Sequence, residues 1–171
     1  SASAQESRQG NVGAGTGATV GKLRGIAQAT KAGLGMASLS AGRLVVAALM
    51  VVNAFGDIVD PSRGEIIAGA RDPQGDGFVN TALALRTMAV RNVLAFKSTV
   101  IGVIATNARL DVAQANVIAD AAHDGLARVV RPAHTLFDGD TLFTLATGKV
   151  RAHQALVADM AAEATSLAIL N

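Results

Sequence analysis

The fold is decided by residues 99–130, which read TVIGVIATNARLDVAQANVIADAAHDGLARVV. Residues 99–106 are mostly apolar and β-branched, and such a run predicts a buried strand. Asp111 precedes a stretch with apolar residues at every third or fourth position, which predicts a helix over residues 112–130 that Asp111 caps. Its buried face is expected to contain Val112, Ala115, Ala119, Ala122, Leu126 and Val129.

The segments on either side predict further layers of the same kind. Residues 43–53, RLVVAALMVVN, are rich in Val and predict a strand that is buried on both faces. A second apolar run, residues 33–40, lies so close to it that the two predict a hairpin. Residues 140–147 predict another strand and residues 151–170 a second helix, while residues 78–96 are expected to be a linker with some helix. This order predicts an α/β fold with layered packing.

Composition limits the classes of protein to which the chain can belong. Its 171 residues fit a single domain, residues 1–171, and half of them are apolar, which is enough to bury a core. There is no Cys, so disulfides and thiolate metal sites are excluded. With a formal charge of +2 and only 3% aromatic residues, the chain has neither a basic field nor rings on which bases could stack. We therefore expect no nucleic-acid partner.

The mean hydropathy of +0.38 raises the question of a membrane. The longest apolar run, residues 44–52, has about half of the roughly 20 residues that a spanning helix needs. We therefore expect no membrane partner and a cytoplasmic location. Low charge combined with high apolarity favours a homo-oligomer.

Three motifs suggest ligands that the surrounding residues do not support. Residues 13–18, GAGTGA, partly match the dinucleotide-binding fingerprint, but no Asp or Glu stands between residues 11 and 56 to bind a ribose. Residues 72–77 resemble the start of a calcium loop whose twelfth position would be Leu83 instead of Glu. The three His residues lack zinc-ligand spacing and are expected to be capping or core residues. We therefore expect no cofactor and no metal.

Three polar features remain that could carry chemistry. Ser98-Thr99 stands at the start of the first predicted strand, residues 138–140 read Asp-Gly-Asp before another strand, and Lys22 ends a Gly-rich stretch. Each feature also has a structural interpretation, because polar residues commonly precede strands, Asp-Gly-Asp commonly forms a turn, and a Lys after a Gly-rich loop is commonly solvated.

Five blocks of the sequence carry a resemblance when they are taken together. They are GNVGAGTGATVGK (10–22), VVNAFGDIVDP (51–61), TVIGVIATNARL (99–110), AHDGLARVVRPAHT (122–135) and DGDTLF (138–143). In this order and spacing they resemble the family that includes the DmpA aminopeptidase, the β-peptidyl aminopeptidases and the nylon-oligomer hydrolases. The resemblance implies an α-β-β-α sandwich, of which this chain is the C-terminal part. It also implies a precursor that cuts itself before a Ser or Thr, which then serves as the N-terminal nucleophile.

Carried over by position, the resemblance places the cut between Ser98 and Thr99 and makes Thr99 the nucleophile. Residues 1–98 are then the end of the large segment, and residues 99–171 are the small segment. The family usually has Asn where this chain has Ser98. The family chain is also longer at its N-terminus, so the expected partner is a missing N-terminal segment of the same precursor.

The resemblance places the acid pair on Asp138 and Asp140, the lysine on Lys22 and the side-chain amide on Asn53. An N-terminal Thr can use its own α-amine, with a pKa of about 7.7–8.0, as the base for its hydroxyl. The two Asp residues are two positions apart, which in an extended segment puts both on one face, where they could orient Thr99. Asn53 could donate to a tetrahedral oxyanion, and Lys22 could add positive charge there or bind a substrate carboxylate.

The expected function is therefore hydrolysis of short peptides or aliphatic amide oligomers by a Thr nucleophile that autoproteolysis exposes. Two alternatives stay open. One is a non-catalytic or precursor-locked relative that serves as an assembly domain, and the other is an acyltransferase that uses a similar Thr.

Overall fold

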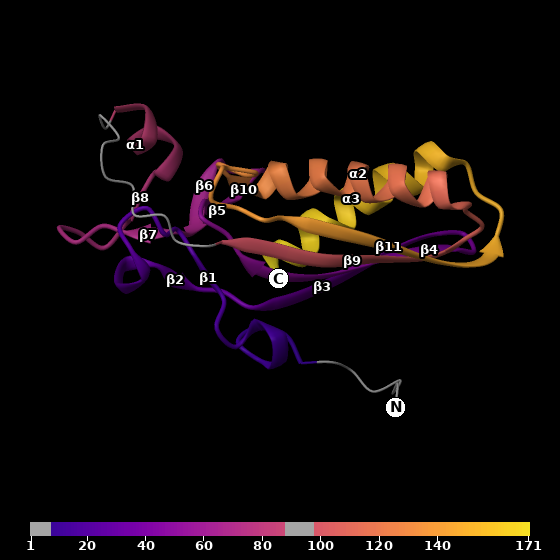
Figure 1. Cartoon of the computed structure of the whole chain (residues 1–171), viewed down its shortest axis with the longest axis horizontal. Helices are drawn as coiled ribbons and strands as arrows, with labels where there is room; N and C mark the ends of the chain where they lie inside the picture. Colours follow the sequence, from indigo (N-terminus) through magenta and orange to yellow (C-terminus); the bar gives the residue numbers. More distant parts are fainter. Residues whose placement is uncertain (1–7, 88–97) are drawn as a thin grey trace.

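The computed structural model describes residues 8–87 and 98–171 (Figure 1). Its centre is a four-stranded sheet in the order β11-β9-β4-β3, formed by Thr141–Val150, Thr99–Ala108, Leu44–Asn53 and Leu34–Ala41. β3 and β4 form the predicted hairpin, β4 pairs with β9 in antiparallel register, and β11 pairs with β9 in parallel. The four predicted strands and the α/β class are confirmed.

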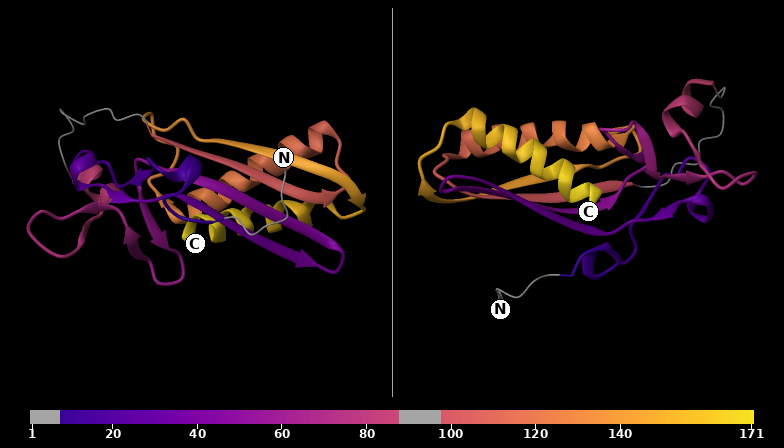
Figure 2. Two further views of the ribbon diagram at one scale, coloured as in Figure 1. Left: turned by 90° about the horizontal axis from the view of Figure 1, so that it is seen from below. Right: turned by 180° about the vertical axis from the view of Figure 1, so that it is seen from behind.

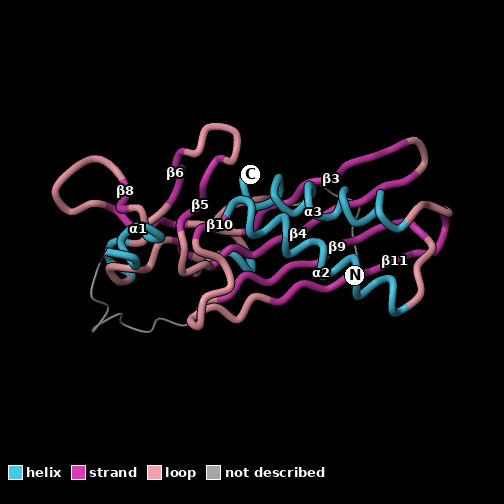
Figure 3. The backbone as a smooth tube through the Cα atoms, turned by 90° about the horizontal axis from the view of Figure 1, so that it is seen from above, coloured by secondary structure: helices cyan, strands magenta, loops and turns pink. Residues whose placement is uncertain are grey.

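Two helices, α2 (Val112–Val129) and α3 (Gln154–Leu170), cover one face of this sheet (Figures 1 and 3). The Asp111 side chain accepts from the Gln114 N–H at 2.8 Å, and the Gln114 side chain accepts from the Asp111 N–H at 3.0 Å. The predicted N-cap is therefore confirmed as a capping box. His153 caps α3 through its Nδ1, as expected of a capping His. No helix in the described part of the chain is long and apolar enough to cross a membrane.

The two helices approach each other closely through small residues. A Cβ on Gly125 would stand 1.9 Å from the carbonyl oxygen of Ala162, so only glycine permits this crossing. The Ser166 hydroxyl donates to the Gly125 carbonyl across the interface at 2.8 Å. The predicted face of α2 is buried at Ala122, Leu126 and Val129. At Val112 the prediction is wrong, because this residue is 80% exposed and burial along α2 begins only at Ile118.

No helix of the described residues covers the opposite face of the sheet (Figure 2). Burial alternates along β4, with one set of side chains under the helices and the other facing outward. The prediction that residues 43–53 are buried on both faces is therefore wrong for the described structure. The outward side chains are nevertheless apolar, and the larger exposed ones are Val45, Leu49, Ile101, Val103, Phe143 and Leu145. We refer to these six residues as the open face.

Short elements surround the end of the sheet where β4 stops and β9 begins (Figure 1). They are two 3-10 turns (Gly13–Gly15, Ile26–Gln28), the pairs β1–β2 (Thr19–Val20, Thr30–Lys31) and β7–β8 (Ala70–Arg71, Phe78–Val79), α1 (Thr81–Thr87), and a sheet in the order β10-β5-β6 (Val130–Arg131, Asp57–Asp60, Glu65–Ala68). α1 lies within the expected linker, and residues 88–96 of that linker are outside the described residues. These short elements bring loops from distant parts of the sequence to one end of the sheet.

One buried carboxylate ties this region together. Asp57 accepts from the Thr81 N–H at 2.7 Å, the Thr81 hydroxyl at 2.8 Å and the Ala70 N–H at 3.1 Å. Burial raises the pKa of Asp57, and these hydrogen bonds offset part of that rise. Asp57 therefore joins β5 to β7 and to the start of α1.

Candidate functional site

The Ser98–Thr99 peptide bond lies at the N-terminal end of β9, where Thr99 pairs with Asn53 at the end of β4. Ser98 is buried, and its N–H donates to the Phe137 carbonyl at 3.0 Å. The Ser98 carbonyl accepts from the Gly139 N–H at 2.9 Å, and it also accepts from the Thr99 hydroxyl. The structure thus fixes the carbonyl of this bond between a backbone donor and the hydroxyl expected to be the nucleophile.

Backbone pairing brings Lys22 to this point. The Lys22 N–H donates to the Phe55 carbonyl at 2.9 Å, and the Gly21 N–H donates to the Gly56 carbonyl at 2.8 Å. Gly21 has a φ of +70°, and a Cβ there would stand 1.9 Å from the Ala70 nitrogen. Only glycine satisfies both constraints, so the last glycine of the Gly-rich stretch places Lys22 against the segment after β4.

The Lys22 side chain is buried, with only 3% of the residue exposed. Its Nζ donates to the Asn53 Oδ1 at 2.7 Å, to the Asn53 carbonyl at 3.0 Å and to the Ser98 Oγ at 3.3 Å. Burial lowers the pKa of Lys22 from 10.5 to about 8, although the charge of Asp138 acts in the opposite direction. The interpretation of Lys22 as a solvated surface lysine is therefore wrong.

The Asn53 side chain is held in one orientation. Its Oδ1 accepts from the Lys22 Nζ and from the Thr19 N–H, the latter at 3.2 Å. Among the described residues, none accepts a hydrogen bond from the Asn53 Nδ2. The amide therefore has a donor available for an incoming oxygen. A cavity of about 320 Å³ adjoins it, lined by Gly17, Thr19, Lys22, Ile26, Ala29, Lys31 and Asn53.

Asp138 and Asp140 lie just before β11 and bind the ends of two other strands. Asp138 accepts from the Phe55 N–H, after β4, at 3.0 Å. Asp140 accepts from the Val100 N–H, in β9, at 2.8 Å. Neither carboxylate accepts from the Thr99 hydroxyl, which donates to the Ser98 carbonyl instead. The structure brings the pair to the site, where Asp140 binds the backbone N–H that follows Thr99 and Asp138 binds a backbone N–H just after β4.

Sequence reasoning missed two residues of this site. The Thr135 hydroxyl donates to the Asp138 Oδ2 at 2.6 Å, and the His134 Nδ1 lies 2.9 Å from the Asp140 Oδ2. The prediction that every His is a capping or core residue is wrong for His134, whose side chain is 40% exposed and paired with a carboxylate. The available signal was the position of the two residues, only a few places before the Asp138–Asp140 segment.

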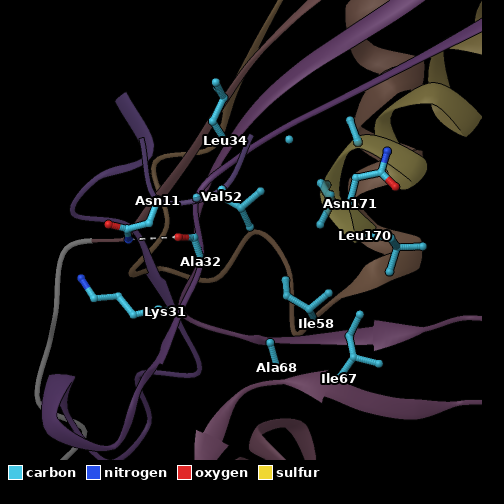
Figure 4. A pocket seen from close by; sticks show the side chains of 15 residues that line it. Asn11, Lys31, Ala32, Leu34, Val52, Ile58, Ile67, Ala68, Leu170 and Asn171 are labelled. Carbon is cyan, nitrogen blue, oxygen red and sulfur yellow. Dashed lines mark hydrogen bonds between the residues drawn. The ribbon is translucent and has the colours of Figure 1, made fainter. Parts of the chain in front are cut away.

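A separate pocket of about 350 Å³ lies between the β3–β4 hairpin, the β5–β6 hairpin and the end of α3. Figure 4 shows Ile58, Ile67, Ala68 and Leu170 on its apolar side, with the Lys31 side chain at another edge. None of the predicted site residues lines this pocket, so the candidate site is the smaller cavity beside Asn53. The described residues contain no group of three or more side chains that could hold a metal ion.

Comparison with known sequences gives a consistent set of relatives. The sequence model of peptidase family S58 matches residues 1–171. An uncharacterized aminopeptidase of Mycobacterium leprae is 41% identical over 151 residues, which cover 84% of this chain and 38% of that protein. The 6-aminohexanoate-oligomer endohydrolase of Paenarthrobacter ureafaciens is 31% identical over 145 residues, which cover 83% of this chain and 40% of that protein. The chain thus spans about two fifths of the length of these relatives.

Solved structures share the fold. A β-aminopeptidase from Burkholderia sp. superposes with a TM-score of 0.63 at 25% identity, covering 95% of this chain and 45% of that one. An L-aminopeptidase D-Ala-esterase/amidase from Ochrobactrum anthropi, described as a variant of the Ntn hydrolase fold, gives a TM-score of 0.64 at 17% identity. That match covers 98% of this chain and 45% of the other, and at this identity it shows the fold alone.

Proposed function

The chain belongs to peptidase family S58, as the resemblance in its sequence predicted, and we propose that it hydrolyses amide bonds with Thr99 as an N-terminal nucleophile. The observation that carries this proposal is the buried Lys22, whose Nζ is hydrogen-bonded to both Asn53 and Ser98. Burying an ammonium group is costly, so three contacts from one lysine at the expected cleavage point favour a chemical role over a structural one.

The proposed maturation step begins at the Ser98–Thr99 bond. The Thr99 hydroxyl oxygen attacks the Ser98 carbonyl carbon, the C–N bond breaks, and the hydroxyl proton passes to the nitrogen. Water then cleaves the resulting ester, which leaves a carboxylate on Ser98 and a free α-amine on Thr99. The Gly139 N–H, which already donates to the Ser98 carbonyl, is placed to stabilise the oxyanion of this step.

After maturation, the Thr99 α-amine serves as the base for the Thr99 hydroxyl, and the hydroxyl oxygen attacks the substrate carbonyl. The Asn53 Nδ2 donates to the oxyanion, and Lys22 holds that amide in place through its contact with Oδ1. Asp138 fixes the backbone after β4, and Asp140 fixes the backbone that follows the nucleophile at the start of β9. Substrate would occupy the cavity of about 320 Å³, where Ile26 and Ala29 supply an aliphatic wall.

The names of two relatives support a proposal about the substrate class. One relative is named an aminopeptidase and another an oligomer endohydrolase acting on 6-aminohexanoate oligomers. We propose short peptides or aliphatic amide oligomers as substrates of this chain, since its cavity has an aliphatic wall and lysines rather than rings.

The open face supports a proposal about the partner. Its six large apolar residues lie on three adjacent strands, and a surface of this kind marks an interaction site. The chain spans about two fifths of the length of its relatives. We therefore propose that another segment of the same precursor covers the open face in the complete protein. We also propose that the complete protein is a cytoplasmic homo-oligomer, and that cleavage divides this chain into residues 1–98 and residues 99–171.

The test is an assay for release of free amine from short peptides with unblocked N-termini and from 6-aminohexanoate oligomers. The complete protein should release amine from at least one of these substrates, and Thr99→Ala should release none. A folded Thr99→Ala protein with full activity would refute the proposed nucleophile. A wild-type protein that is uncut and inactive on every substrate would instead support the precursor-locked alternative.

A further inference from the structure

His134 has a backbone conformation that side-chain-bearing residues rarely adopt. Its φ is +52°, and no other residue except glycine has a positive φ among residues 8–87 and 98–171. Such conformations persist where the surroundings enforce them, and they cluster at functional sites. His134 lies in the loop between β10 and β11 and is partly exposed, so core packing does not explain why its backbone is held in this way.

The His134 imidazole is the outer end of a chain of contacts that leads to the nucleophile. Its Nδ1 lies 2.9 Å from the Asp140 Oδ2, and the Asp140 side chain is only 3% exposed. The other oxygen of that carboxylate accepts from the Val100 N–H at 2.8 Å. Because the Val100 N–H belongs to the peptide bond that follows Thr99, the orientation of Asp140 fixes the backbone on the C-terminal side of the nucleophile.

A second histidine braces the first. The His123 ring, from α2, meets the His134 ring edge to face, with the ring centroids 4.9 Å apart. Burial lowers the pKa of His123, and the charge of His134 lowers it further, while Asp140, Asp120 and Asp124 act in the opposite direction. The His123 Nδ1 is buried and has no hydrogen-bond partner among the described residues. His123 thus contacts the ring of His134, and among the described residues His134 is the histidine paired with Asp140.

We propose that His134 is a positioning residue for the proposed hydrolase. Donation from its Nδ1 holds the Asp140 carboxylate in the orientation that receives the Val100 N–H, and this keeps Thr99 aligned for attack. His134 does not touch the reacting atoms, so its effect passes entirely through Asp140. The inference rests on the proposed function, and it adds a requirement that the hydrogen bond from position 134 be present.

Two variants of nearly the same shape test this requirement. His134→Asn places an amide nitrogen where the imidazole has its Nδ1, and Asn is one of the few residues enriched at positive φ. His134→Asp has the same shape and the same backbone tolerance, but its carboxylate repels Asp140 instead of donating to it. His153→Asn is the control, because His153 caps α3 outside this site and Asn is also a good N-cap.

The measurements are kcat and KM for amine release and the extent of self-cleavage in the complete protein, with thermal unfolding as the check on folding. His134→Asn should stay within about threefold of the wild-type kcat, and His134→Asp should lose about tenfold or more in kcat with little change in KM. If His134→Asp does not fold, His134→Gly accepts the same φ without the imidazole and should show the same loss. His153→Asn should keep the wild-type kcat.

Thr99→Ala, assayed in parallel, separates the two levels of the proposal. If Thr99→Ala is inactive while the Asn, Asp and Gly variants at position 134 all match the wild type, the role of His134 is refuted and the proposed function stands. If His134→Asn is as impaired as His134→Asp although both are folded, the hydrogen bond is not what matters and the inference is also refuted. If Thr99→Ala is fully active, both proposals fail.

Discussion

Lys22→Met should remove activity without lowering stability at pH 7. Met has a similar length and no charge, so it fits the buried position without the cost of a buried ammonium group. Burial lowers the pKa of Lys22 from 10.5 to about 8, and this difference corresponds to about 3 kcal/mol by which folding disfavours the charged form. The loss of the contacts to Asn53 and Ser98 offsets part of that gain. We expect the free energy of unfolding at pH 7 to equal that of the wild type within about 1 kcal/mol, or to exceed it.

The sign of the pH dependence follows from the same pKa. Between pH 8 and pH 10.5 the unfolded chain keeps the Lys22 proton while the folded chain has lost it. The unfolded state therefore binds more protons, and the free energy of unfolding of the wild type should rise with pH across this window. Lys22→Met should lack this rise. Lys31→Met, which changes an exposed lysine of the same cavity, should keep it.

Although Lys22→Met should keep its stability, it should lose activity. Without the Lys22 ammonium, the Asn53 amide keeps only the Thr19 N–H of the two donors that orient it. The loss of one oxyanion donor costs about 2.7–4 kcal/mol, or a factor of about 100–1,000 in kcat. Urea unfolding at pH 7 and pH 9 and initial rates of amine release are the two measurements. A Lys22→Met protein that is destabilised by about 3–5 kcal/mol and retains its activity per folded molecule would refute this reasoning and make Lys22 a structural residue.

Four further substitutions have distinct expected outcomes, and a fifth serves as a control. Asp138→Ala and Asp140→Ala should each lower self-cleavage or kcat at least tenfold, about 1.4 kcal/mol, because the first frees the Phe55 N–H after β4 and the second frees the Val100 N–H that follows Thr99. Wild-type rates in both variants would make the pair a simple turn. In Gly139→Ala the new Cβ would meet the Thr99 Oγ1 at 3.2 Å, so self-cleavage should slow by about tenfold, whereas Gly75→Ala, with open space around it, should cleave normally; equal rates would contradict the observed contact. Asp57→Asn should lower the urea-unfolding free energy by about 1–3 kcal/mol because an amide N–H₂ would face N–H and O–H donors, and an unchanged midpoint would argue against that network.

The local pattern of the sequence predicted most of the sheet and its helices. The β-branched run after Thr99 and the cap at Asp111 depend on neighbours in the chain, so composition and spacing suffice to identify them. The error at residues 43–53 has a physical reason. A Val-rich strand is apolar on both faces whether helices cover both faces of its sheet or, as in the described residues, only one. Its sequence alone therefore does not distinguish the two arrangements.

The site was harder to predict because its contacts join distant segments. The family resemblance predicted Lys22, Asn53, Asp138 and Asp140 as site residues. The burial of Lys22, however, depends on pairing with a segment more than 30 residues away. Spacing suggested that the two carboxylates share a face toward Thr99, and their role in orienting it stays a prediction. His134 was assigned to no site because its left-handed backbone and its contact with Asp140 exist only in the folded loop.

The most direct test of the proposed mechanism is whether the bond between Ser98 and Thr99 is cut. Denaturing mass spectrometry of the complete protein, combined with N-terminal sequencing, should find a fragment that begins at Thr99-Val100 and has the mass of residues 99–171. Thr99→Ala should remain intact, and Thr99→Ser, which keeps the hydroxyl, should still be cut. A single uncut mass in a fully active preparation would contradict an N-terminal nucleophile at Thr99.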